Sequence, residues 1–146
     1  MCSWQLLLMM KHSPLEIRIY YEDTDCGGVV YYANYFKYFE RARTEFLRQK
    51  GVSVAELASQ GILFVVNEAR IKYLAPARYN DVLLVDTAIA DKGGASFVLS
   101  HTVADMLTGR LIVEGSARLV CVKTDTGRPV RLPDVLKQAL ELVETS

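Results

Sequence analysis

The sequence predicts an α+β fold in which an antiparallel sheet of about five strands wraps one long central helix. Three observations carry this prediction. A strongly amphipathic helical pattern runs from about residue 33 to residue 50. Four β-rich segments follow it, and tight glycine turns at 92–94 and 108–109 join three of them. An amphipathic helical segment, 132–144, ends the chain.

The first strand is predicted over LEIRIYY, residues 15–21. Leu15, Ile17 and Ile19 alternate with polar residues, which is typical of a half-buried strand. The acidic turn that follows, over 22–28, is expected to end this strand.

The central helix is predicted because apolar side chains recur with a helical period. These side chains are Tyr35, Phe36, Phe39, Ala42, Phe46 and Leu47. Asn34 is a candidate N-cap, and Gly51 is a stop signal after the last turn. On the polar face, Arg41 and Glu45 have the i,i+4 spacing of an ion pair.

A short second helix is predicted over 53–60, with Ser53 as its cap and Glu56 completing a capping box. The strands that follow are predicted at 62–74, 81–91, 95–106 and 110–124. We expect one domain over 13–146. Residues 1–12 are expected to be a poorly ordered N-terminal extension, because their apolar run is too short for a spanning helix and lacks a basic start.

Composition excludes several classes of function. The 146 residues carry 17 basic and 17 acidic side chains, whereas a nucleic-acid-binding protein needs a basic excess. Three cysteines without CxxC spacing and only two histidines predict neither a disulfide framework nor a metal site. Reduced thiols fit a cytoplasmic protein.

The stretch 20–51 carries the chemistry. An acidic turn with Asp23 and Asp25 precedes the pair Gly27-Gly28, and the central helix begins a few residues later. Glycines allow close backbone approach, and the helix start offers unpaired N–H groups. A carboxylate beside such amides can attack a carbonyl that they polarise. The alternative is that both aspartates only form Asx turns at the end of the strand.

The segments RIYYEDTDCGGVVYYANYFKYFERARTEFLR and YLAPARYND resemble the hotdog-fold acyl-CoA thioesterases. The similarity points to the 4-hydroxybenzoyl-CoA-thioesterase-like group and its Tol–Pal-associated (YbgC-type) branch. It implies hydrolysis of acyl-CoA to free acid and CoA without a cofactor, since CoA is part of the substrate. It implies Asp25 as nucleophile or general base, and helix N-terminal amides near Tyr32 as the oxyanion hole. It further implies a homodimer or homotetramer, with the active site between subunits.

Further substrate-binding residues are predicted on either side of this motif. Gly28 is expected to approach the substrate, and Tyr32 and Tyr35 to line an acyl pocket. Many members of the branch carry histidine where Tyr32 stands, and tyrosine cannot replace a histidine in proton exchange near neutral pH. Cations for the CoA phosphates could come from Arg70, Lys72, Arg78, Lys92 or Arg118. Lys92, together with Ser96 at the hairpin turn, is preferred.

Two other functions remain open. The replacement at Tyr32 also fits a non-catalytic acyl- or CoA-binding scaffold that serves membrane-linked enzymes. A hotdog dehydratase ranks last, because it needs a histidine near the start of the helix and none lies between His12 and His101. We expect His101 to be a satisfied core or interface histidine and Cys26 a small filler. The acyl-chain preference, and whether CoA or an acyl carrier protein delivers the thioester, stay open.

Overall fold

The computed structural model describes residues 14–144, so the predicted extension over 1–12 lies outside the described residues. The elements are β1 (Leu15–Arg18), a 3-10 turn η1 (Tyr21–Asp23), α2 (Asn34–Gln49), α3 (Val54–Ser59), β2 (Ile62–Tyr73), β3 (Val82–Lys92), β4 (Ser96–Asp105), β5 (Leu111–Lys123) and α4 (Asp134–Glu144). Apart from β1, each predicted helix and strand has boundaries within two residues of the observed ones.

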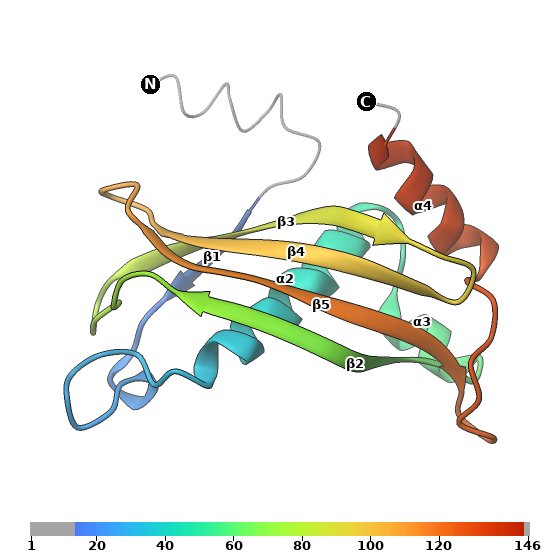
Figure 1. Cartoon of the computed structure of the whole chain (residues 1–146), viewed down its shortest axis with the longest axis horizontal. Coiled ribbons are helices and arrows are strands. Elements are labelled where there is room, and N and C mark those ends of the chain that lie inside the picture. Colours follow the sequence, from blue (N-terminus) through green and yellow to red (C-terminus); the bar gives the residue numbers. More distant parts are fainter. Residues whose placement is uncertain (1–13, 145–146) are drawn as a thin grey trace.

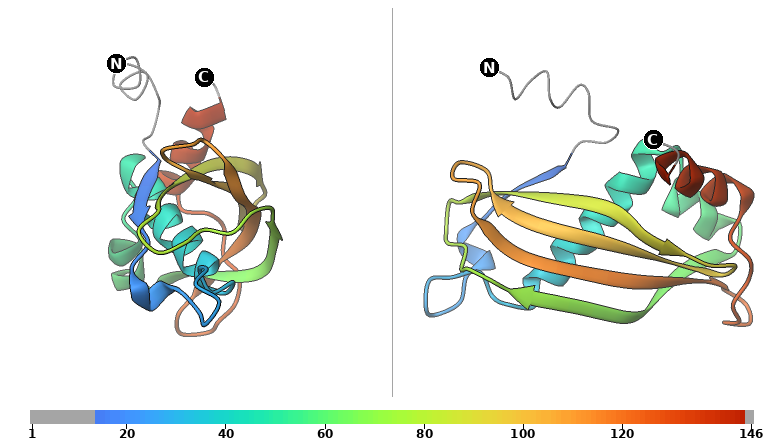
Figure 2. Two further views of the ribbon diagram at one scale, coloured as in Figure 1. Left: turned by 90° about the vertical axis from the view of Figure 1, so that its left-hand side faces the viewer. Right: turned by 45° about the horizontal axis from the view of Figure 1, so that its top comes forward.

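The strands of the described chain form one five-stranded antiparallel sheet in the order β1-β3-β4-β5-β2. β3, β4 and β5 are the predicted meander. β2 precedes them in the sequence but pairs with β5, from Ile62 opposite Lys123 to Tyr73 opposite Val113, so it lies at the edge of the sheet (Figure 1). This is a hotdog fold, as predicted, with α2 inside the curled sheet (Figure 2).

The central helix buries a stripe that differs in one detail from the predicted one. Its buried side chains are Tyr35, Tyr38, Phe39, Ala42, Phe46 and Leu47. Phe36 was expected in this stripe but is 40% exposed, whereas Tyr38 is 1% exposed. Both lie near the border of the stripe, and the face that the sheet covers decides between them.

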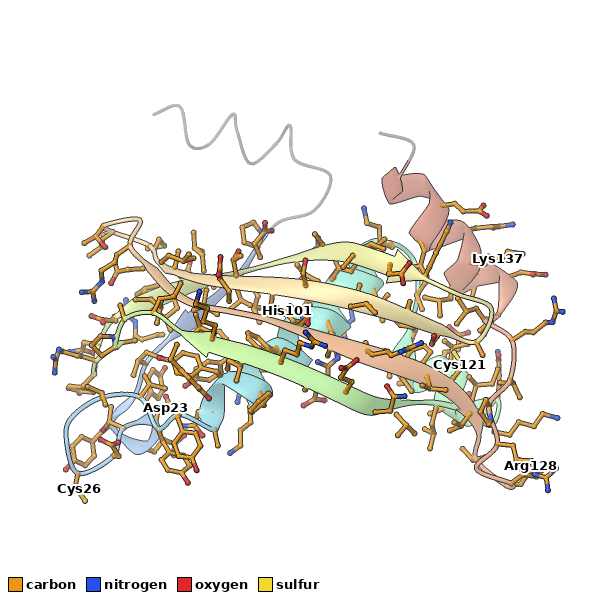
Figure 3. All side chains as sticks on the ribbon, viewed as in Figure 1. Asp23, Cys26, His101, Cys121, Arg128 and Lys137 are labelled. Carbon is orange, nitrogen blue, oxygen red and sulfur yellow. The ribbon has the colours of Figure 1, made fainter. Side chains whose placement is uncertain are left out.

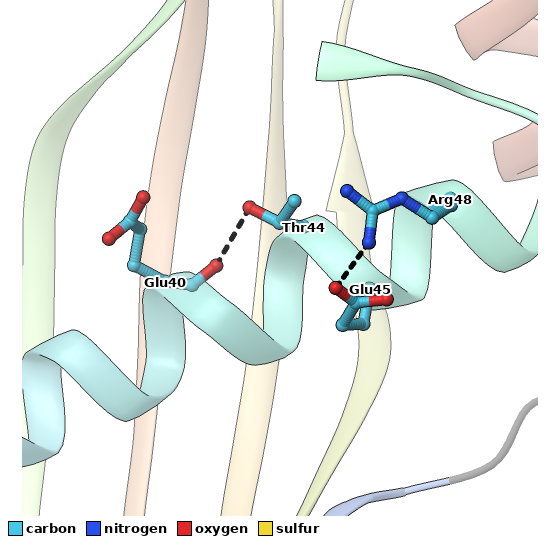
Figure 4. Close-up of polar contacts among 4 residues, drawn as sticks. All are labelled: Glu40, Thr44, Glu45 and Arg48. Carbon is cyan, nitrogen blue, oxygen red and sulfur yellow. Dashed lines mark hydrogen bonds and ion pairs between the residues drawn. The ribbon is translucent and has the colours of Figure 1, made fainter. Parts of the chain in front are cut away.

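The polar face of α2 pairs its charges differently from the prediction (Figure 4). Glu45 forms its ion pair with Arg48, one turn further along, and the expected Arg41–Glu45 pair is wrong. Arg41 instead places its guanidinium 5.9 Å from the centre of the Tyr38 ring. The i,i+3 and i,i+4 neighbours compete for one carboxylate, which sequence spacing cannot resolve.

The first strand is shorter than predicted because its last residues enter a turn. The Asp23 carboxylate accepts a hydrogen bond from the Tyr20 N–H over 2.8 Å, and the Thr24 N–H donates to the Tyr21 carbonyl over 3.1 Å. These bonds wind 21–23 into the 3-10 turn. The cap of α3 is confirmed, since the Glu56 N–H donates to Ser53 Oγ over 3.1 Å. None of the helices within 14–144 could span a membrane.

Candidate active site

The turn η1 and the loop after it carry the acidic residues, and backbone hydrogen bonds join the two arms of the loop. Thr24 and Val30 form an isolated antiparallel bridge. The Asp25 N–H donates to the Val29 carbonyl over 2.9 Å, and the Gly28 N–H donates to the Asp25 carbonyl over 3.0 Å. Gly28 has a φ of +81°, a conformation that other residues rarely adopt. Glycine at this position therefore permits the turn that carries Asp25.

The Asp25 carboxylate is exposed, and the loop uses only one of its oxygens. Oδ1 accepts from the Gly27 N–H at 2.8 Å and from the Val29 N–H at 3.4 Å. No donor within residues 14–144 is recorded for Oδ2. Both Asp23 and Asp25 thus accept backbone hydrogen bonds within the turn, as expected if these aspartates served only to form Asx turns. Asp25 keeps, in addition, one oxygen available to a substrate or to water.

Asp23 ties the loop to the start of the helix. Its carbonyl accepts from the Tyr31 N–H over 2.9 Å and from the Asn34 side chain over 3.0 Å. The prediction that Asn34 caps α2 is therefore wrong. The N-cap position is Ala33, without a side-chain cap, and the Asn34 amide group is used to hold the loop.

The two amides just before α2 have no acceptor within residues 14–144. The Asn34 N–H donates to the Tyr31 carbonyl over 2.9 Å. For the N–H groups of Tyr32 and Ala33, no acceptor is recorded within the described part of the chain. Free amides at a helix N-terminus carry partial positive charge and favour an oxygen with developing negative charge.

Several tyrosine rings cluster at this helix start. The Tyr32 ring centre lies 4.8 Å from that of Tyr31 and 6.4 Å from that of Tyr73. Tyr32 is 60% exposed, so its ring can meet a ligand. Tyr35 is buried, and its ring centre lies 5.8 Å from that of Tyr73. Burial raises the pKa of Tyr35 to about 12, which keeps its hydroxyl protonated.

Lys92 and Ser96 lie at the other end of the molecule. They flank the β3–β4 turn, where the Gly93 N–H donates to the Ser96 carbonyl over 2.7 Å. Figure 1 shows this turn beside α4, far from the loop that carries Asp25. The Lys92 Nζ is 4.0 Å from a carboxylate oxygen of Glu141 on α4. A single chain does not bring Lys92 and Ser96 to Asp25.

Two residues beside the loop were not singled out as site residues by the sequence analysis. Arg78, one of several candidate cations, forms a backbone bridge with Val29 and is exposed. Tyr73 was not considered, although it opens the YLAPARYND segment. Its ring and hydroxyl contact the start of α2. The resemblance over that segment was the available signal for both.

Cys26 and His101 lie in opposite surroundings. Cys26, which was expected to be a small filler, is instead exposed in the loop (Figure 3). His101 is buried on β4, and burial lowers its pKa to about 3. Within residues 14–144, no three metal-binding side chains gather at one place.

Comparisons with known proteins agree with this arrangement. Residues 20–140 match the family described as the thioesterase-like superfamily. The acyl-CoA thioester hydrolase YbgC of Escherichia coli O157:H7 is 40% identical over 117 residues, covering 80% of this chain and 87% of the relative. The acyl-CoA thioesterase YbgC of Haemophilus influenzae is 36% identical over 124 residues, covering 84% and 90%.

Solved structures extend the similarity to the fold. A DHNA-CoA thioesterase from Staphylococcus aureus superimposes with a TM-score of 0.85 at 31% identity, covering 91% of each chain. The family match spans most of the sequence, including the Asp25 loop and the helix start. The chain therefore belongs to the thioesterase-like superfamily, as a hotdog-fold enzyme of the YbgC group.

Proposed function

We propose that this protein hydrolyses acyl-CoA thioesters to the free acid and CoA, with Asp25 as the catalytic carboxylate. The activity named for the Escherichia coli and Haemophilus influenzae relatives supports the reaction class. One observation carries the site assignment. A single hydrogen-bonded loop joins Asp25, whose Oδ2 has no recorded donor, to a helix start at which two amides have no recorded acceptor.

The proposed mechanism uses both halves of this loop. The thioester carbonyl oxygen accepts hydrogen bonds from the free amides of Tyr32 and Ala33. As the carbonyl carbon becomes tetrahedral, negative charge grows on that oxygen, and each fixed donor stabilises it by roughly 3–4 kcal/mol in comparable acyl-transfer sites. The C–S bond then breaks, and CoA leaves as the thiolate.

Asp25 Oδ2 can act in either of two ways. It can bond to the carbonyl carbon, giving a mixed anhydride that water then hydrolyses. It can instead take a proton from the water that attacks the carbon. Both routes consume only the thioester and water, so neither needs a cofactor. Rapid-quench mass spectrometry of the enzyme during turnover distinguishes them, since only the first places an acyl group on Asp25.

Thiol release from a panel of short, long and aromatic acyl-CoAs tests the assignment in the wild type and in Asp25→Asn. Asparagine keeps the side-chain oxygen that accepts from Gly27, so the loop should fold normally. It cannot act as a nucleophile or base. We expect kcat/KM to fall by at least about 100-fold, equivalent to about 2.7 kcal/mol of transition-state stabilisation.

Asp125→Asn is the matched control, because Asp125 is exposed in a turn at the other end of the chain. Its activity should equal that of the wild type. Equal activity in Asp25→Asn would refute the site assignment. If the wild type binds acyl-CoA without hydrolysing any of the panel, the scaffold function replaces the enzymatic one.

We also propose that the working form is a homodimer or a homotetramer, with a dimer joined through β2. Antiparallel pairing of two β2 strands would place the Tyr73 end of one beside the Ile62 end of the other. The β3–β4 turn lies toward the Ile62 end of the sheet (Figure 1). Lys92 and Ser96 of one subunit would therefore lie toward the Asp25 end of the other, where cations could meet the phosphates of CoA.

Three further proposals come from the sequence analysis, and the second of them rests on the resemblance. The enzyme acts in the cytoplasm, it is connected with the Tol–Pal system, and an acyl carrier protein is a second candidate carrier of the thioester. Cell fractionation and copurification with tagged protein test the first two. Turnover of one acyl group presented on CoA and on acyl carrier protein tests the third.

A further inference from the structure

The hydroxyl of Tyr73 reaches the start of α2 from the end of β2. It donates a hydrogen bond to the Tyr32 carbonyl over 3.0 Å, between residues 41 positions apart in the sequence. Within residues 14–144, no other side chain donates a hydrogen bond to the peptide group that joins Tyr32 to Ala33.

A rigid element delivers this hydroxyl. Tyr73 is opposite Val113 in the β2–β5 register, and the next two N–H groups, of Leu74 and Ala75, both donate to the Ile112 carbonyl. The Tyr73 ring also packs edge-on against the buried ring of Tyr35. The position of the Tyr73 hydroxyl is therefore set by the sheet and the core, and not by the loop that carries Asp25.

Because the peptide bond is planar, the hydrogen bond from Tyr73 also affects the N–H group of Ala33. The carbonyl of Tyr32 and the N–H of Ala33 belong to one planar group and point in opposite directions. A donor that fixes the carbonyl therefore fixes the direction of the Ala33 N–H. Donation to the carbonyl also polarises the peptide group, which makes its N–H a stronger donor.

The neighbouring peptide group is held in the same way by the local turn. The Tyr31 carbonyl accepts from the Asn34 N–H over 2.9 Å, which fixes the direction of the Tyr32 N–H. The two free amides therefore have different supports. The turn itself holds the Tyr32 N–H, and Tyr73 holds the Ala33 N–H.

We propose that Tyr73 is a positioning residue for thioester hydrolysis, which orients the free amide of Ala33 through its hydrogen bond to the Tyr32 carbonyl. The inference rests on the proposed function of the Tyr32 and Ala33 amides as the oxyanion hole. Tyr73 acts through the backbone and need not touch the substrate. Because the bond aligns the Ala33 N–H toward the charge of the transition state, its loss should lower kcat more than it raises KM.

The test is Tyr73→Phe, which removes the hydroxyl and keeps the ring. With an acyl-CoA that the wild type hydrolyses, we expect kcat to fall about 10-fold, equivalent to about 1.4 kcal/mol. KM should stay within about twofold and the melting temperature should be almost unchanged, because the ring packing remains. Tyr79→Phe is the matched control, since Tyr79 is exposed and its hydroxyl has no recorded partner within 14–144.

An unchanged kcat in Tyr73→Phe would overturn the inference, as would a rise in KM alone or an equal loss in Tyr79→Phe. Nuclear magnetic resonance supplies a readout that needs no turnover. In Tyr73→Phe, the Ala33 amide resonance should shift, whereas the resonances of the Tyr32 and Asn34 amides, which the turn supports, should shift less. If no acyl-CoA is hydrolysed by the wild type, the proposed function fails, and these amide signals still decide whether Tyr73 holds the helix start.

Discussion

The imidazole of His101 is stacked on the ring of Phe39 from α2, with ring centres 4.6 Å apart and an interplanar angle of 14°. Its Nδ1 is 3.0 Å from Thr87 Oγ1 on β3, and Nε2 has no recorded partner in the described chain. Burial and, as the smaller cause, the Arg43 cation together lower the pKa of His101 to about 3. The folded protein therefore holds this histidine neutral.

The stability of the fold should consequently fall in mild acid. The unfolded chain binds a proton at His101 near pH 6.5, whereas the folded chain binds it only near pH 3. Stability from this site is complete above pH 6.5 and declines toward pH 3, by up to about 1.4 kcal/mol per pH unit. Urea unfolding at pH 7.5 and pH 5.0 measures the effect.

The comparison is with His101→Gln, which has no titrating group at this position. Between the two pH values, the wild type should lose about 2 kcal/mol more of its unfolding free energy than the variant loses. The carboxylates common to both proteins cancel from this difference. Identical losses would show that His101 is not held neutral in the fold.

At the scale of elements, the contact between α2 and β5 depends on a glycine. Gly115 faces the helix, and a Cβ built there would lie 2.5 Å from Cε2 of Phe39 and 2.7 Å from the Arg70 carbonyl oxygen. The Arg70 oxygen belongs to the backbone of β2 and cannot move without disturbing the sheet. The missing side chain therefore allows the central helix to pack closely on the strand.

Gly115→Ala should destabilise the fold by about 1–3 kcal/mol, the usual cost of overpacking a core. Gly94→Ala is the control, because its Cβ would meet nothing within 4 Å. That change should be neutral or slightly stabilising, since alanine restricts the unfolded chain. Equal unfolding midpoints for the two variants in urea would contradict the close packing inferred at Gly115.

Local pattern predicted most of the elements because their apolar periods are long and their turns contain glycine. The hairpin turns at Gly93 and Gly109 and the cap at Ser53 lie where expected. The pattern failed at β1, where alternation continued through Tyr21 but the Asp23 carboxylate draws the chain into a turn. A competing side-chain hydrogen bond is not visible in periodicity.

At the scale of the whole molecule, β2 leaves apolar side chains and a strand edge exposed. Leu63, Val65 and Val66 are each at least 41% exposed, and β2 has a neighbouring strand on one side only within the described chain. An exposed, apolar edge strand favours pairing with another copy of the same strand. This is the structural support for the proposed dimer.

Light scattering after size exclusion should therefore give at least twice the 16.4 kDa mass of one chain. Replacing Leu63 and Val65 with lysine places charges beside the edge and should shift the protein toward monomer. Val135→Lys on α4 is the control, because Val135 is similarly exposed but lies away from β2. A monomeric wild type, or an unchanged mass in the double variant, would refute pairing through β2.

The sequence by itself determined the α+β class, the place of nearly every element and the loop that carries Asp25, because these depend on periodicity, turn residues and a contiguous motif. The tertiary structure decided which strands are neighbours, which oxygen of Asp25 is free, and that Tyr73 supports the start of α2. It also separated Lys92 and Ser96 from Asp25 within one chain. The physical reason is distance along the chain: spacing encodes contacts within a few residues, whereas contacts between distant residues exist only after the sheet has closed around the helix.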